Sequence, residues 1–206
     1  MKVLELFAGS RSIGKAAESL GYEVFSVDIE DFEGIDYVTD IMDFDYLKIP
    51  FIPDIIWASP PCTSFSVASI GRHWNKDRTP KTANAIKGMD IVKKTLEIIQ
   101  HYIWHNPRLY YYIENPRGML RKMDFMLDIF RRTVTYCQYG DSRMKPTDIW
   151  TNNIHWNPRA MCKNGMPCHV SAPRGSSTGT QGLKGNYERS KIPNDLCLEV
   201  LTINKI

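Results

Sequence analysis

Short apolar runs alternate with amphipathic stretches along most of the chain. The runs end at polar or turn-forming residues, as buried strands do, and they lie at 3–7, 23–27, 54–58, 109–113, 133–138 and 147–151. Apolar residues at helical spacing predict helices at 15–20, 84–105 and 123–130, and a helix or strand at 192–203. Strands that alternate with helices predict an α/β fold, with a doubly wound, mostly parallel sheet.

Residues 152–188 interrupt this pattern. They have no hydrophobic period and are rich in Gly, Ser, Thr and Pro, so they predict a small, irregular, loop-rich insert. The insert would follow a main domain at 1–151, and residues 189–206 would return to that domain. No apolar run approaches the roughly 20 residues of a membrane span, and the N-terminus does not resemble a signal peptide. We therefore expect a cytoplasmic protein that is not secreted and has no membrane partner.

The net charge of +3 conceals a split along the chain. Residues 1–60 carry 4 Lys and Arg against 12 Asp and Glu, a balance of −8, whereas residues 61–206 have a balance of +11. The basic part suggests a polyanionic partner. The five cysteines are an odd number, which favours a reducing compartment with free or metal-bound thiols.

The candidate functional residues lie at the carboxyl ends of the predicted strands, which is where open α/β sheets bind ligands. A glycine turn at 8–14 follows the first strand and opens a helix, so its free N–H groups could face a ligand. Taken alone, the glycine pattern is explained equally well by a tight strand-to-helix turn that binds no ligand. Asp28 ends the next strand, where a carboxylate can accept both ribose hydroxyls of an adenosine. Asp40 could read an adenine amino group, although a solvated acidic loop explains it as well.

Two further strand ends present reactive groups. Cys62 follows Pro60 and Pro61, which stiffen the turn and present the thiol at the ligand edge of the sheet, where a nucleophile is needed. Glu114 ends a strand in an apolar neighbourhood, so its pKa could be raised and it could donate a proton. Glu114 could equally be a structural carboxylate next to a helix that begins at Pro116.

Together these motifs resemble the cytosine-5 DNA methyltransferase family. The matching segments occur in the family's order, at 4–10 (LELFAGS), 54–66 (DIIWASPPCTSFS) and 112–116 (YIENP). The resemblance implies a Rossmann-like, S-adenosylmethionine-dependent catalytic domain at 1–151. It also implies that the Cys62 thiolate adds to carbon 6 of a cytosine flipped out of duplex DNA, while Glu114 acts on ring N3 and Asn115 orients the turn.

The resemblance assigns further residues to the cofactor. They are Phe7, Ala8, Gly9, Ser10, Asp28, Ile29, Asp40, Ile41, Pro60 and Ser190. The family's Gln-x-Arg-x-Arg element is altered, and Arg143 or Lys145 would replace the arginine that helps to hold the base. The family's Gly-Asn-x-x-Pro element is matched weakly, because Arg189 and Ser190 stand at its Gly and Asn.

The insert is several times smaller than the family's target-recognition domain. It would recognise the substrate with few residues, discriminate little between target sequences, or depend on a protein partner for specificity. Its basic residues, with those of the loop after Cys62, suit phosphate contact. The residues expected to bind nucleic acid are Arg72, His73, Trp74, Lys76, Arg78, Lys81 and Arg174.

Cysteine and histidine also gather in the insert. Cys162, Cys168 and His169, with Cys137 or His155 as a fourth ligand, could hold a structural zinc ion that staples a segment without a core of its own. Unliganded polar loop residues are the competing interpretation. For the whole protein, the alternatives to DNA methylation are the same chemistry on transfer RNA, or a degenerate module that binds nucleic acid without turnover.

Overall fold

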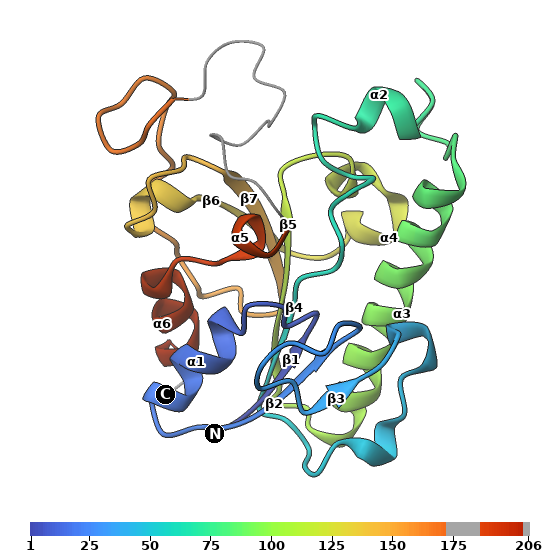
Figure 1. Cartoon of the computed structure of the whole chain (residues 1–206), viewed down its shortest axis with the longest axis vertical. Helices are drawn as coiled ribbons and strands as arrows, with labels where there is room; N and C mark the ends of the chain where they lie inside the picture. The colour runs from blue at the N-terminus through green and yellow to red at the C-terminus, as the bar shows by residue number, and fades with distance from the viewer. Residues whose placement is uncertain (172–185, 204–206) are drawn as a thin grey trace.

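The computed structural model describes residues 1–171 and 186–203, and one open sheet lies at its centre (Figure 1). The strand order is β3-β2-β1-β4-β5-β7-β6; the neighbours from β3 to β5 are parallel, and β7 is antiparallel to β5 and β6. The strands are β1 (Lys2–Leu6), β2 (Glu23–Asp28), β3 (Tyr37–Val38), β4 (Ile55–Ala58), β5 (Tyr110–Pro116), β6 (Arg131–Thr135) and β7 (Pro146–Thr151). The predicted mostly parallel α/β sheet is therefore confirmed.

Helices cover both faces of the sheet, as a doubly wound fold requires (Figure 1). Helices α3 (Ala83–His105) and α4 (Asp124–Leu127) lie on one face, and α1 (Ser12–Ser19) and α6 (Asn194–Thr202) lie on the other. The short helices α2 (Ile70–His73) and α5 (Asn186–Ser190) lie near the carboxyl ends of the strands. Across the described ranges, no helix combines the length and apolarity that crossing a membrane would need.

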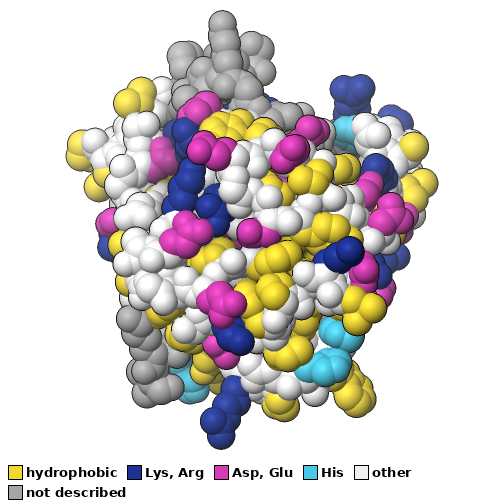
Figure 2. Space-filling view, turned by 60° about the horizontal axis from the view of Figure 1, so that its bottom comes forward, with side chains coloured by type: hydrophobic (Ala, Val, Ile, Leu, Met, Phe, Trp, Pro, Cys, Tyr) yellow, Lys and Arg dark blue, Asp and Glu magenta, His cyan; other side chains and the backbone are white. Residues whose placement is uncertain are grey.

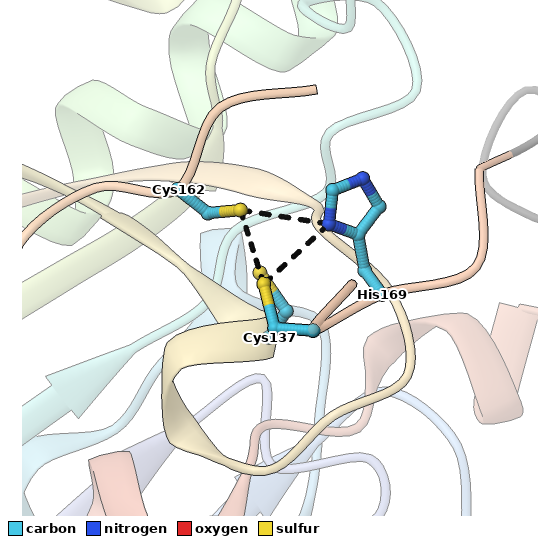
Figure 3. Close-up of side chains that lie close together, drawn as sticks. Cys137, Cys162 and His169 are labelled. Carbon is cyan, nitrogen blue, oxygen red and sulfur yellow. Dashed lines mark hydrogen bonds between the residues drawn. The ribbon is translucent and has the colours of Figure 1, made fainter. Parts of the chain in front are cut away.

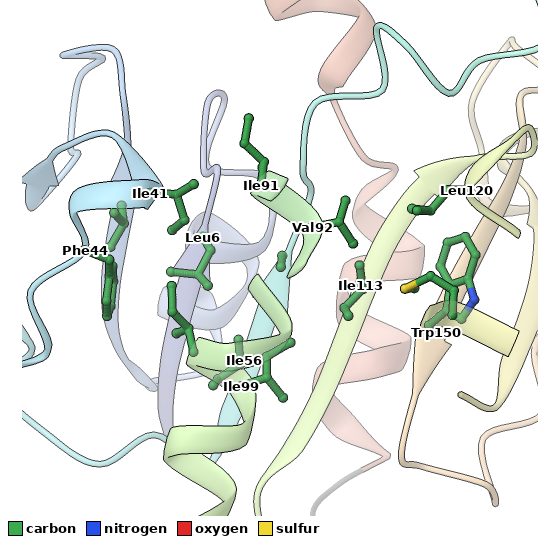
Figure 4. Packing of buried hydrophobic residues seen from close by; sticks show 14 of the residues in the cluster. Leu6, Ile41, Phe44, Ile56, Ile91, Val92, Ile99, Ile113, Leu120 and Trp150 are labelled. Carbon is green, nitrogen blue, oxygen red and sulfur yellow. The ribbon is translucent and has the colours of Figure 1, made fainter. Parts of the chain in front are cut away.

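The sheet separates two hydrophobic clusters. Strand β4 is buried along its whole length, and only the first residue of β1 is exposed, which explains their nearly continuous apolar sequences. Between the sheet and α3, residues such as Leu6, Ile56 and Ile99 form one cluster (Figure 4). The second cluster joins the opposite face of the sheet to α1 and α6. The two layers fix the sheet, so the loops at its carboxyl edge begin from rigid positions.

Charges of both signs are interspersed on the face shown in Figure 2. The acidic N-terminal part and the basic remainder of the chain therefore do not appear there as two separate surfaces. The N-terminus lies at the end of the sheet opposite α2 (Figure 1).

The structure corrects three boundaries. The expected strand at 133–138 ends at Thr135, and residues Tyr136–Tyr139 form a 3₁₀ turn (η4) before Gly140, which has a φ of +85°. The expected helix at 123–130 is limited to α4, and the acidic loop after Asp28 contains the two-residue edge strand β3. Short apolar runs look the same in strands and turns, and a two-residue strand carries no period.

The first residues of the insert pack into the hydrophobic core. Trp156 is fully buried in the second cluster, and its ring meets that of Tyr112 edge-on at 5.9 Å. Its indole Nε1–H donates to Glu199 Oε1 of α6 at 2.9 Å, and its carbonyl accepts from Arg132 Nε at 3.2 Å. These contacts place the first residues of the insert against the sheet and α6.

Replacing Trp156 by alanine should lower the free energy of unfolding by about 3–5 kcal/mol, because it leaves a large cavity and removes the hydrogen bond to Glu199. Urea denaturation followed by circular dichroism measures this change. The matched control is Trp104→Ala, since Trp104 on α3 is 79% exposed and its loss should change stability little. Equal effects of the two substitutions would contradict the anchoring role of Trp156.

Candidate active site

The loop after β4 presents Cys62 at the carboxyl edge of the sheet. The Cys62 carbonyl accepts hydrogen bonds from the N–H groups of Phe65 and Ser66, both at 3.0 Å, so the chain turns back immediately after the thiol. Cys62 is half-buried, whereas Pro60 is buried beneath it. The predicted stiff, strand-end presentation of the thiol is what the structure shows.

One side-chain and one backbone hydrogen bond join this loop to the end of β5 and to the segment that follows it. Asn115 donates from Nδ2 to the Pro60 carbonyl at 2.9 Å, and the Met119 N–H donates to the Phe65 carbonyl at 2.7 Å. Gly118 lies so close that a Cβ atom there would be 2.1 Å from the Phe65 carbonyl oxygen. Only glycine permits this approach, so the residue fixes the distance between the thiol loop and the end of β5.

Glu114 lies at the centre of a buried polar cluster. Its Oε1 accepts from the Tyr136 hydroxyl at 2.9 Å and lies 3.7 Å from Lys145 Nζ. Lys145 is itself buried, donates to the Arg189 carbonyl at 3.1 Å, and places its ammonium 4.5 Å from the centroid of the Tyr136 ring. Lys145 is therefore the cation beside the carboxyl group, and the η4 turn explains why Tyr136 can reach it.

The surroundings of the Cys62 thiol oppose its ionisation. Burial and the negative charge of Glu114 raise the pKa of Cys62, while Lys145 and Arg189 act in the opposite direction. All three charges thus act on the same sulfur. A change that strengthens the cations or neutralises Glu114 would favour the thiolate, which is the nucleophilic form.

Arg143 has a different environment from Lys145. Its guanidinium forms a bidentate ion pair with Asp141 and donates to the backbone carbonyls of Arg189 and Lys191. It is buried and fully engaged by these partners, so it ties the turn at 140–145 to the C-terminal segment. Of the two predicted substitutes for the family's arginine, only Lys145 contacts Glu114.

A pocket of about 290 Å³ lies beside the glycine turn. Among the predicted cofactor residues, those that line it are Phe7, Asp28, Ile29, Asp40 and Ile41. Lys87 of α3 also lines it and pairs with Asp40 at 3.8 Å. Asp28 accepts from the N–H of Gly9 at 2.8 Å and from that of Glu30 at 3.0 Å, so its carboxylate is held rigidly at the end of β2.

The remaining predicted cofactor residues lie around this pocket without lining it. Pro61, rather than Pro60, forms its wall on the side of Cys62. Gly9 has a φ of +48°, and a Cβ atom there would lie 3.7 Å from the Ser190 hydroxyl, so these two residues are neighbours. Ala8 and Ser10 are buried within the turn. The Ile192 N–H donates to Ser12 Oγ at 3.1 Å and fastens the C-terminal segment to the turn.

Glu5 is a residue of this site that the sequence did not single out. It is 2% exposed, and its carboxyl oxygens accept from the N–H groups of Ile13 and Gly14 and from the Ser26 hydroxyl, all at 3.1 Å. Burial raises the pKa of Glu5 to about 7, and these hydrogen bonds act against that rise. The carboxyl group caps the beginning of α1 and sets the shape of the glycine turn.

The basic loop after Cys62 divides into buried and exposed members. Trp74 is 4% exposed, stacks on Phe65 and donates from Nε1 to the Ser64 carbonyl at 2.7 Å. His73 is equally buried and bonds through Nδ1 to the Thr82 hydroxyl at 2.7 Å. These two residues anchor the loop, which corrects the expectation that they face nucleic acid. The exposed basic residues are Arg72, Lys76, Arg78 and Lys81, and Arg174 lies outside the described residues.

The structure also gathers the thiols and imidazole of the insert. Cys162, Cys168 and His169 meet Cys137 of η4, and their ligand atoms all lie within 4.8 Å of one another. His155 is exposed and is not a member of this group. Of the two candidates for a fourth ligand, the geometry therefore selects Cys137.

Comparisons with known proteins identify relatives of this chain. It is 30% identical to the "Probable DNA (cytosine-5)-methyltransferase" of frog virus 3, over 98% of this chain and 100% of that protein. The Entamoeba histolytica methyltransferase EhMeth matches 73% of this chain at 14% identity (TM-score 0.49), and Spodoptera frugiperda DNMT2 matches 77% at 17% identity (TM-score 0.47). The chain covers about half the length, 52%, of each of these two solved structures. No family model matches it.

The Gly118 contact predicts a sharp steric effect. Gly118→Ala should lower the free energy of unfolding by about 1–3 kcal/mol, because the new methyl group displaces the Phe65 carbonyl. Thermal and urea denaturation measure the loss. Gly71→Ala is the matched control, since a Cβ atom at Gly71 meets nothing within 4 Å. A Gly118→Ala protein as stable as this control would refute the close approach.

The charges around Cys62 predict opposite shifts in two variants. In the wild type, the pH profile of alkylation at Cys62 should have an apparent pKa above that measured in urea, because burial opposes the thiolate. Lys145→Gln should raise this pKa further, and Glu114→Gln should lower it. Peptide mass spectrometry measures alkylation at Cys62 separately from the other cysteines. Lys48→Gln, at a distant exposed lysine, should cause no shift; shifts in the reverse directions would contradict the arrangement.

Proposed function

The chain belongs to the DNA (cytosine-5)-methyltransferase family, and we propose that it methylates carbon 5 of cytosine in DNA through the thiol of Cys62. The observation that carries this proposal is the junction of two strand ends. The end of β4 supplies a half-buried thiol, and the end of β5 supplies a buried carboxyl group beside Lys145. A nucleophile and an acid–base group thus face one site.

The chemistry explains why both groups are needed. Carbon 5 of cytosine is a poor nucleophile, but addition of a thiolate to carbon 6 pushes electrons toward carbon 5. A carboxyl group that hydrogen-bonds or protonates ring N3 withdraws electrons and makes carbon 6 easier to attack. After methyl transfer, a base removes the proton at carbon 5 and the bond between sulfur and carbon 6 breaks, which regenerates Cys62.

Tyr136 and Lys145 would hold Glu114 for this task. The hydroxyl of Tyr136 and the ammonium of Lys145 both approach Oε1, so the other carboxyl oxygen would be the one to contact the base. Lys145 also favours the thiolate of Cys62, as does Arg189. Arg143 is a positioning residue, because its contacts run to Asp141 and the C-terminal segment. Asn115 supports the thiol loop through the Pro60 carbonyl.

The pocket beside the glycine turn fits part of S-adenosylmethionine. Its volume of about 290 Å³ lies at the lower end of small-molecule sites, a size suited to the adenosine portion. Phe7, Ile29 and Ile41 would contact adenine, Asp28 would accept from the ribose hydroxyls, and Asp40 would accept from the adenine amino group. When bound, S-adenosylmethionine supplies the electrophilic methyl group. The residues Gly9, Ser10 and Ser190 lie where the methionine portion would extend.

Double-stranded DNA would approach the carboxyl edge of the sheet. The exposed cations of the loop at 72–81 are placed to contact phosphates, and the buried Trp74 fixes the base of that loop. The target base must leave the duplex to reach Cys62, as in other enzymes that modify bases. The C-terminal segment, with Arg189, would form the opposite wall of the site.

A mechanism-based substrate tests this function directly. Duplex DNA that contains 5-fluorocytosine should form a covalent complex with the wild-type protein and S-adenosylmethionine, because fluorine at carbon 5 cannot be removed as a proton is. Denaturing electrophoresis and peptide mass spectrometry should locate the bond at Cys62. Cys62→Ser should form no adduct, whereas Cys197→Ser, at a buried cysteine of α6, should retain it.

A second assay, used with the trapping experiment, distinguishes DNA methylation from the alternatives. Methyl transfer from radiolabelled S-adenosylmethionine is measured with duplex DNA, single-stranded DNA and transfer RNA. Preference for transfer RNA would replace DNA as the substrate while keeping the role of Cys62. Absence of both adduct and transfer would leave a module that binds nucleic acid without turnover, and would overturn the proposed activity.

A further inference from the structure

The group of Cys137, Cys162, Cys168 and His169 has the chemistry of a zinc site (Figure 3). The sulfur atoms of Cys162 and Cys168 are 3.2 Å apart, and His169 Nδ1 lies 3.5 Å from the first and 3.7 Å from the second. Cys137 joins them from η4, so the ligands come from two segments far apart in the sequence.

The distances from His169 Nδ1 to the two sulfur atoms match the edges of a zinc coordination tetrahedron, whereas the two sulfur atoms lie closer together than such an edge. Zn–S bonds of about 2.3 Å and Zn–N bonds of about 2.0–2.1 Å at tetrahedral angles place neighbouring ligand atoms about 3.5–3.8 Å apart. We propose that these four residues bind one zinc ion in a closed Cys₃His site that staples the insert to the turn leading into the catalytic cluster. With four protein ligands the site has no open position, which makes it structural.

Neighbouring groups support the orientation that metal binding requires. His169 directs Nδ1 at the cysteines, and its Nε2 lies 3.4 Å from the Ser171 hydroxyl, a partner that fixes the ring. Gln138 donates from Nε2 to Cys168 Sγ at 3.5 Å, a contact that suits a negatively charged thiolate. The Cys162 N–H donates to the Thr135 hydroxyl at 2.8 Å, which holds the first ligand of the loop against the end of β6.

A staple suits the insert because, beyond Trp156, polar contacts hold it, such as those of Arg159 with Tyr139 and Gln138. Residues 157–171 form no helix or strand, and the apolar side chains of Met161, Met166 and Val170 are exposed. A segment without a core gains stability chiefly from a cross-link, and a metal supplies one. The only strand-like support in this part is the hydrogen bond from the Val170 N–H to the Ser142 carbonyl, among the described backbone contacts.

The Cys/His group also lies next to residues that contact the cluster around Cys62. Cys137 follows Tyr136, whose hydroxyl donates to Glu114, and the Val170 contact reaches the turn that carries Arg143. The zinc site would therefore connect the short insert to the side chains around Cys62. The metal is inferred from the ligand geometry alone and does not depend on the proposed methylation.

Metal content is the first test. The full chain, purified under reducing conditions without chelators, should contain one zinc ion per chain by elemental mass spectrometry. Cobalt substituted for zinc should show the visible absorption of tetrahedral thiolate coordination. Cys168→Ala and His169→Ala should lose the metal, whereas His155→Ala, a matched exposed histidine outside the cluster, should keep it.

Two results would overturn the zinc site. One is freshly reduced wild-type protein that contains no metal and binds none when zinc is added. The other is full retention of zinc in both Cys168→Ala and His169→Ala. Because these readouts measure metal and not methyl transfer, they stand whether or not the protein methylates DNA.

Limited proteolysis tests the stapling role. Lys163 is exposed between the ligands Cys162 and Cys168, so removal of zinc should speed tryptic cleavage there by roughly tenfold or more. Cleavage at Arg78, in the exposed basic loop, is the internal control and should not change. Equal cleavage at Lys163 with and without metal would show that the ion does not hold the loop.

Discussion

The active site depends on one backbone contact, the hydrogen bond from the Met119 N–H to the Phe65 carbonyl beneath Gly118. Strands β4 and β5 are neighbours, but parallel pairing alone fixes only where they end. Together with the hydrogen bond from Asn115 to the Pro60 carbonyl, this contact keeps the loop that carries Cys62 beside Glu114. Since Gly118 has no side chain, the two segments can touch, and the thiol and the carboxyl group share a site.

Around this contact, the C-terminal segment completes the electrostatic environment. Carbonyl groups at 189–191 accept from Arg143 and Lys145, and Ser12 accepts from the Ile192 N–H. The segment thereby joins the glycine turn to the catalytic cluster. It also brings the charge of Arg189 toward the thiol. The same short segment thus contacts both the glycine turn and the polar cluster around Glu114.

The sequence predicted the features that depend on local pattern. The sheet, its order of helices and the strand-end positions of Cys62, Asp28 and Glu114 follow from apolar runs and the residues that end them. It could not predict contacts that tertiary packing makes. The sequence predicts Tyr136 in a strand because the residues of η4 continue the apolar run of β6. No local pattern around Gly118 indicates its close approach to Phe65. Trp74 looked like a ligand for nucleic acid because its burial depends on Phe65, which packs against it only in the folded chain.

Glu5 has a consequence for the kinds of ligand that this fold can accept. In dinucleotide-binding α/β proteins, the first helix begins with free N–H groups, and these attract the pyrophosphate of the cofactor. Here the carboxyl group of Glu5 already accepts hydrogen bonds from the N–H groups of Ile13 and Gly14. A phosphate would meet an occupied helix end and the carboxylate of Asp28 nearby. These two N–H groups are therefore not available to an anion, so the turn is less suited to a phosphate than the corresponding turn of a dinucleotide-binding protein.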